Sequence, residues 1–298
     1  MLPAMVKARV LLVVMVAVAL VTGCKKKGET REQAGGGDQP PTVTCDKGQL
    51  LDQGKCVPVV TAENVMAVEA QANKLDDLQK TLGKLEVLAA PIELMNAIRQ
   101  LDAWKKFAAS SRKFKEVDNV VEQLSAGVDQ FKAFEAQLAD SRTNLADLTG
   151  TLQGLYEGSG AAKTVADARA KVSSQVQAAI EPLQAKVTEA SAAIEPMLGE
   201  LDKLGDIFSG VCALGSMSGG GDDFKKLCET GRDQFKAAVD FLKAHKDAPK
   251  TLLTELVAGI DSEIGDLISS ETKQLLDQAQ KKVDEAIGTG GDAGAAKK

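Results

Sequence analysis

The chain has 298 residues and a formal net charge of −6, with 26% charged and 3% aromatic residues. An acidic chain without a broad basic stripe is unsuited to a nucleic-acid backbone, and so few aromatic side chains leave little for base stacking or sugar platforms. The composition therefore predicts that nucleic acid is not a partner.

The first 23 residues have the pattern of a secretory signal peptide. Lys7 and Arg9 precede an unbroken apolar run over residues 10–21. This run has the length of the apolar region of a signal, and as a helix it is too short to cross a hydrocarbon layer of ~30 Å. The sequence Val-Thr-Gly-Cys at 21–24 ends the run, and three lysines follow at once.

The motif at 21–24 resembles the lipobox of bacterial lipoproteins. The resemblance implies that the Cys24 thiol receives a diacylglyceryl group, that the signal is cleaved before Cys24, and that the new N-terminus is acylated, typically with palmitate. Several chains on one residue anchor a protein stably, at about 0.8 kcal/mol per buried CH₂. In the lipoproteins that this motif resembles, Asp after the lipidated cysteine favours the inner membrane; Lys25 at that position therefore implies the outer membrane, on its periplasmic or surface face. An ordinary signal peptide, or a membrane-anchored N-terminus, that happens to end in cysteine is the alternative.

Polar segments flank the rest of the chain. Residues 25–44 carry almost no apolar side chain, which predicts a flexible tether over 24–44. Its root-mean-square reach is about 25 Å, from 5–6 Å × √20. The last ten residues, 289–298, are rich in glycine and alanine and predict a disordered tail.

Four further cysteines predict disulfides, because their number is even and the expected compartment is oxidising. Three pairings are possible, and the local one is favoured because each pair then encloses a turn-rich segment; it joins Cys45 to Cys56 and Cys212 to Cys228. Free thiols are the alternative. A metal site is disfavoured because neither segment has Cys-x-x-Cys spacing and the single histidine, His245, is distant. Residues 45–60 are therefore expected to form a small disulfide loop.

Residues 61–288 predict an all-α fold, an elongated antiparallel helical bundle with coiled-coil character. Apolar residues recur at spacings of three and four, so each helix would bury a narrow stripe against its neighbours. After a first run through Leu75 and Leu85, the expected helices cover about 91–156, 161–211, 222–245 and 250–287. The expected breaks are Ala90-Pro91, 158–160, 219–221 and 247–249. Whether 91–156 is one helix stays open, with a break near Ser110-Ser111 as the alternative.

Two similar segments place a proline inside the third of these helices. The sequences AAIEPLQ at 178–184 and AAIEPML at 192–198 are two heptads apart. A proline inside a helix removes one hydrogen bond and bends the helix. The pair predicts two matched bends around neighbouring helices, or else a hinge or partner-docking surface.

No segment predicts catalysis. The loop GSGAAKT at 158–164 lacks the context of a phosphate loop and is interpreted as an interhelix turn, with Lys163 or Thr164 near a helix start. Asp222 and Asp223 are expected to cap a helix after the glycine run, and His245 to lie at a helix C-terminus. No carboxylate pair is singled out, so we expect no enzyme, no cofactor and no metal.

A segment with mixed aromatic and basic side chains, WKKFAASSRKFK, is the candidate partner or membrane surface. It could rest on an anionic membrane or on an acidic partner, or its aromatic residues could simply continue the buried stripe of the bundle, which is the favoured interpretation. Its residues are Trp104, Lys105, Lys106, Phe107, Arg112, Lys113, Phe114 and Lys115.

These patterns together predict a lipid-anchored cell-envelope protein with a non-catalytic structural or partner-binding helical bundle. The expected contacts are the membrane, through the lipid on Cys24, and an envelope protein that the sequence does not identify. A membrane-active helical protein, curvature-shaping or pore-forming, is the alternative. Ligand carriage in the bundle core is a third hypothesis, left open by the alanine-rich stripe.

Overall fold

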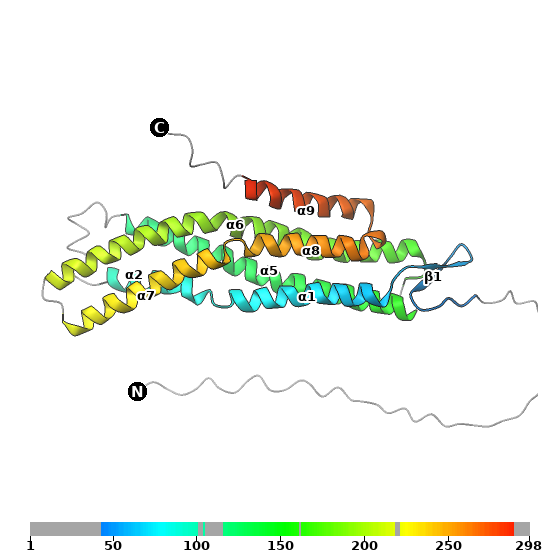
Figure 1. Cartoon of the computed structure of the whole chain (residues 1–298), viewed down its shortest axis with the longest axis horizontal. Helices are drawn as coiled ribbons and strands as arrows, with labels where there is room; N and C mark the ends of the chain where they lie inside the picture. Colours follow the sequence, from blue (N-terminus) through cyan, green and yellow to red (C-terminus); the bar gives the residue numbers. More distant parts are fainter. Residues whose placement is uncertain (1–42, 101–103, 105–115, 161, 218–220, 289–298) are drawn as a thin grey trace, which may run out of the picture. The chain divides into compact units, whose positions relative to one another are not determined.

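The computed structural model describes residues 43–100, 104, 116–160, 162–217 and 221–288. The chain divides into two units between Thr42 and Val43, and the described residues all belong to the second unit. Within this unit a small β-hairpin precedes a set of packed α-helices (Figure 1). The all-α helical bundle preceded by a disulfide loop is confirmed.

Two strands and seven α-helices make up the described residues. The hairpin strands are β1 (Gln49–Asp52) and β2 (Lys55–Pro58). The helices are α1 (Ala62–Leu82), α2 (Glu86–Arg99), α5 (Val117–Glu157), α6 (Val165–Met217), α7 (Asp222–His245), α8 (Ala248–Ile264) and α9 (Ser270–Gly288), with a 3₁₀ turn, η1, at Gly265–Leu267. At 1.5 Å per residue, the 41 residues of α5 and the 53 residues of α6 extend over about 60 and 80 Å.

The helices form a closed four-membered ring in which two members are each built from two helices in series. α5 and α6 make the most extensive pairing and run antiparallel. α1 and α2 follow one another along α5, while α7 and α8 follow one another along α6. Contacts of α1 with α8 and of α2 with α7 close the ring, and α9 packs outside it on α6 and α8. Short connections between antiparallel neighbours are typical of up-and-down bundles.

The three-four spacing builds one continuous core. The stripes predicted from the sequence are buried along the long central helices, as at Phe131, Phe134 and Leu138 on α5 and at Leu183 and Leu204 on α6. Small residues on α6 are fully buried as well, including Ala179 and Ala190. Alanines at these positions allow neighbouring helices to approach closely.

The break between α1 and α2 lies at residues 83–85, so the expected break at Ala90-Pro91 is wrong. α1 ends at Leu82 with Gly83 as its C-cap, and tight turns follow in which the Leu85 and Leu88 amides donate to the carbonyls three residues earlier. Pro91 instead lies buried inside α2. A proline there removes the one helical bond to the Val87 carbonyl, and burial of its ring in the core offsets this loss.

A single helix over 91–156 is excluded by an ion pair between Arg99 and Asp118. In one uninterrupted helix these residues would lie about 28 Å apart. The chain therefore reverses direction between α2 and α5, and the proposed break near Ser110-Ser111 lies outside the described residues. Asp76 of α1 pairs with Arg142 of α5 at 3.1 Å.

The single helix expected over 250–287 is instead divided into α8, η1 and α9. Ile268 has extended backbone, and the Ser269 hydroxyl accepts the Thr272 amide at 3.2 Å, which caps α9. The Ser269 amide donates to the Ser173 hydroxyl of α6 at 2.7 Å, and Gln177 of α6 donates to the Thr272 hydroxyl at 3.0 Å. These bonds hold the reversal against α6.

α6 remains one helix through both of its internal prolines. Pro182 has no amide hydrogen to donate to the Ala178 carbonyl, and Asn144 of α5 donates to that oxygen at 3.0 Å. The neighbouring Ala179 carbonyl accepts the fully buried Ser141 hydroxyl at 2.8 Å. The carbonyl that Pro182 leaves without its helical bond is therefore satisfied by the partner helix.

Candidate functional site

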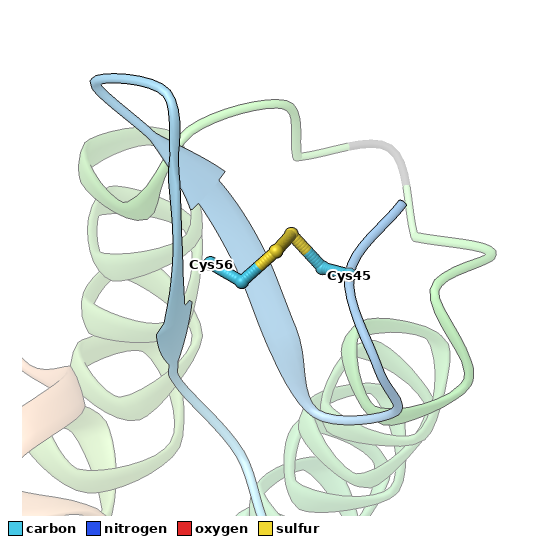
Figure 2. Close-up of a disulfide and its surroundings, with 2 residues drawn as sticks. All are labelled: Cys45 and Cys56. Atoms are coloured by element: carbon cyan, nitrogen blue, oxygen red, sulfur yellow. A yellow bond between two sulfur atoms is a disulfide. The ribbon is translucent and has the colours of Figure 1, made fainter. Parts of the chain in front are cut away.

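The candidate functional site is the segment that connects the N-terminal region to the bundle, residues 43–60, called here the hairpin cap. β1 and β2 pair antiparallel, with Leu51 opposite Cys56. Their turn residues Gln53 and Gly54 have φ of 46° and 80°, as a type I′ turn requires. The expected disulfide Cys45–Cys56 is confirmed, and Figure 2 shows it joining the segment before β1 to β2.

The hairpin cap is attached to the bundle where α5 ends. The Gly48 amide donates to the Tyr156 carbonyl at 2.7 Å, while the Gly48 carbonyl accepts the Val59 and Val60 amides at 2.8 and 3.1 Å. Gly48 has φ of 74°, and a Cβ there would lie 2.0 Å from the Val60 carbonyl oxygen. Only glycine fits this close approach. The Lys47 ammonium lies 5.7 Å from the centre of the Tyr156 ring, a cation–π contact.

The two faces of the cap differ. Leu50 packs against the core, whereas Leu51, the next residue along β1, points to the opposite face and is 43% exposed. Val43 is 49% exposed and Met66, in the second turn of α1, is 58% exposed. Across the described residues these three are the large apolar side chains that stay exposed, and all three belong to residues 43–66.

The second expected disulfide, Cys212–Cys228, is confirmed as well. It joins the last turns of α6 to the second turn of α7, and both cysteines are buried. Because α6 begins beside the cap and contacts β1, this second disulfide lies about 70 Å further along α6. The two disulfides therefore stabilise opposite ends of the same helical unit.

The aromatic and basic segment predicted as a partner surface is described only at Trp104. That side chain is 7% exposed, which agrees with its interpretation as part of the buried stripe. The other residues proposed for this surface lie outside the described residues, as does the expected lipidation site Cys24; they are Lys105, Lys106, Phe107, Arg112, Lys113, Phe114 and Lys115.

The remaining sequence motifs are structural where they are described. Gly158, with φ of 72°, ends α5, and the Thr164 hydroxyl accepts the Asp167 amide at 3.1 Å at the start of α6. Asp222 is the first residue of α7 and the N-cap is Gly221, so the expected N-cap aspartate is wrong. His245 ends α7, with Nδ1 at 2.8 Å from the Phe241 carbonyl oxygen.

Among the described residues, two carboxylates have a lowered pKa, and each has a structural cause. The Lys80 ammonium bonds to Asp76 one helical turn earlier and, together with Arg142, holds the pKa of that carboxyl below its ordinary value. The pKa of Glu271 is lowered by its own backbone amide and by the Ser269 hydroxyl at the start of α9. Both groups serve helix packing and capping.

Open grooves lie along the helix pairs. One of about 470 Å³ follows α5 and α6 past Gly150, Gly154 and Lys171, and another of about 410 Å³ follows α6 and α7 past Phe208 and Arg232. Among the described residues, histidine, cysteine and carboxylate side chains form no group of three or more placed to hold a metal ion. None of the described helices is both long and apolar enough to cross a membrane.

Comparison of the chain with protein-family models, with curated proteins and with solved structures found no match.

Proposed function

We propose that this chain is a lipid-anchored cell-envelope protein whose helical bundle is a non-catalytic structural or partner-binding element. The observation that carries the proposal is the pairing of the cysteines. Four of the five cysteines form two disulfides within the bundle unit. The fifth, Cys24, ends the apolar run in a sequence that resembles a lipobox and is followed by three lysines.

Two further features support this proposal. Disulfides form and persist in oxidising compartments such as the bacterial periplasm, which suits an exported protein. The long helices α5 and α6 offer extended surfaces suited to spacing or binding a second envelope protein. The membrane would be reached through acyl chains on Cys24, with the outer membrane favoured by Lys25.

Lipidation is tested by expressing the full chain in a bacterium that processes lipoproteins. The mature protein should have a mass increased by the diacylglyceryl and acyl groups and should partition into detergent. A Cys24→Ala variant should lose both properties. A Cys45→Ser/Cys56→Ser variant, which keeps Cys24, is the matched control and should retain them. Processing that continues unchanged under globomycin would contradict the proposal.

The role of the bundle is tested separately with the anchored protein. Membrane fractionation should place it in the outer membrane, and cross-linking there should recover a defined complex with one envelope protein. Leakage or tubulation of vesicles on addition of the anchored protein would instead favour the membrane-active alternative.

A further inference from the structure

Among the described residues, the large exposed apolar side chains lie close together in the sequence, on the hairpin cap and the start of α1. Val43, Leu51 and Met66 lie on the hairpin cap and the first two turns of α1, while comparable side chains elsewhere in the described bundle are at least partly covered. Single exposed apolar residues are ordinary, but their confinement to 24 consecutive residues needs a cause. The face of the hairpin that carries Leu51 and the Cys45–Cys56 disulfide is called here the outer face of the cap.

The geometry of the cap places Leu51 beside the disulfide, with Val43 close to it in the chain. Leu51 lies directly opposite Cys56 in the hairpin, so their side chains share a face. Cys56 is bonded to Cys45, which is two residues from Val43. The disulfide therefore holds the start of the described chain beside the strand that carries Leu51 (Figure 2).

The length of chain between Cys24 and the hairpin cap indicates what covers the exposed apolar side chains, namely the lipid surface. Val43 follows Cys24 by 19 residues, which span at most about 65 Å when fully extended and about 25 Å as a flexible tether. A surface tethered this closely meets the membrane at an effective concentration in the millimolar range, so a weak contact suffices to hold it there. The end of α6 near Cys212 is about 70 Å further away along that helix.

We propose that the outer face of the hairpin cap, with Val43 and Leu51, docks on the lipid surface to which Cys24 is anchored. This inference rests on the proposed lipid anchor. The cap carries Asp46 and Asp52 against Lys47 and Lys55, so its acidic and basic side chains balance. Docking is therefore apolar, and it is insensitive to salt and to the proportion of anionic lipid.

The test uses the full lipidated chain in phosphatidylcholine vesicles, with and without brominated acyl chains that quench tryptophan on contact. A Leu51→Trp variant reports on the cap. The matched control is Thr230→Trp, an exposed position on α7 beside the Cys212–Cys228 disulfide. Both are made in a Trp104→Phe background, and also with the buried Trp104 retained, in case its loss disturbs folding.

Brominated lipid should at least halve the emission of the Leu51→Trp variant and change that of the Thr230→Trp variant by less than a tenth. The same ratio should hold in 1 M salt. Amide exchange in β1 of the unmodified sequence should also be at least fivefold slower for the anchored chain than for Cys24→Ala. If brominated lipid quenched the Leu51→Trp and Thr230→Trp variants equally in a lipidated chain, the docking of the cap would be refuted while the lipid anchor would stand. Shielding of the cap without quenching, as a protein partner or second copy would cause, would also overturn it. A chain without acyl groups would overturn both the docking and the proposed anchor.

Discussion

Gly231 of α7 lies where three helices meet, and replacing it with alanine should destabilise the protein. A Cβ at this position would lie 2.2 Å from Cζ of Phe208 on α6 and 2.7 Å from Cδ2 of Leu94 on α2. Ordinary contacts begin near 3.4 Å, so the Phe208 ring would have to move by more than 1 Å. That ring is 1% exposed and packs against Phe235 at a centroid distance of 5.4 Å, which leaves it little room.

Two opposing effects set the magnitude of this change. Alanine is favoured over glycine inside a helix by about 0.5–1 kcal/mol, whereas overpacking a filled core costs typically 1–3 kcal/mol. The difference is about 0–2.5 kcal/mol, and we expect a net loss of about 1–2 kcal/mol because the Phe208 ring has little room to move. For a domain of this size that lowers the melting temperature by about 2–8 °C, because each kcal/mol corresponds to about 2–4 °C.

Gly150→Ala is the matched control, because a Cβ at Gly150 of α5 would meet nothing within 4 Å. Only the helix-propensity gain applies there, so this variant should melt about 1–4 °C above the unmodified protein. Both variants are compared by circular dichroism at 222 nm during heating and in urea. If Gly231→Ala were as stable as Gly150→Ala, the close contact among α2, α6 and α7 would be refuted.

Three other substitutions test separate features. Gly48→Ala should detach the hairpin cap from the end of α5, because φ of 74° and the nearby Val60 carbonyl exclude a Cβ. Proteolysis between the cap and α1 should then become faster while helix content stays constant. An unchanged cleavage rate would contradict the attachment of the cap at Gly48. Replacing Cys212 and Cys228 with alanine should lower the free energy of unfolding by roughly 3 kcal/mol, since their disulfide spans 16 residues. An unchanged free energy of unfolding in urea denaturation would show that the disulfide does not stabilise the fold. The pKa of Asp76 is lowered on folding, so its contribution to stability is present above its ordinary pKa of 3.8 and is lost as the pH falls through the folded value. In acid titrations followed by circular dichroism, Asp76→Asn should therefore differ from the unmodified protein at pH 7 and converge with it in acid, and a difference that grew in acid would show the opposite sign.

The helices were predictable because their physical cause is local. The three-four spacing along α5 and α6 specifies a buried stripe, and burial of such stripes is what holds these helices together. The two disulfides were predictable for a similar reason, since each pair of cysteines encloses a short turn-rich segment. Predictions failed where tertiary contacts outweighed a local signal. Pro91 suggested a break, but the core accommodates its ring inside α2.

The start of α9 and the hairpin have only weak local signals in the sequence. Ser269 begins a serine-serine-glutamate sequence typical of a helix start, yet the reversal it caps depends on Ser173 and Gln177, about a hundred residues earlier. The hairpin was missed because the turn Gln53-Gly54 lacks the Asn-Gly or Asp-Gly pair that most strongly indicates a type I′ turn. The exposure of Leu51 rather than Leu50 depends on how the hairpin docks at Tyr156, which no local pattern specifies.

The contact between α1 and α8 has a consequence for how the chain matures. Asn64 of α1 donates to the Glu263 carbonyl at 2.5 Å, and Lys74 pairs with Glu255 at 3.3 Å, so an early helix is completed by a late one. When the chain is synthesised from its N-terminus, this side of α1 stays exposed until residue 264 has been made. In a polypeptide truncated before α8, that side of α1 would stay exposed to solvent. Chaperones and proteases that recognise incompletely folded chains would bind there.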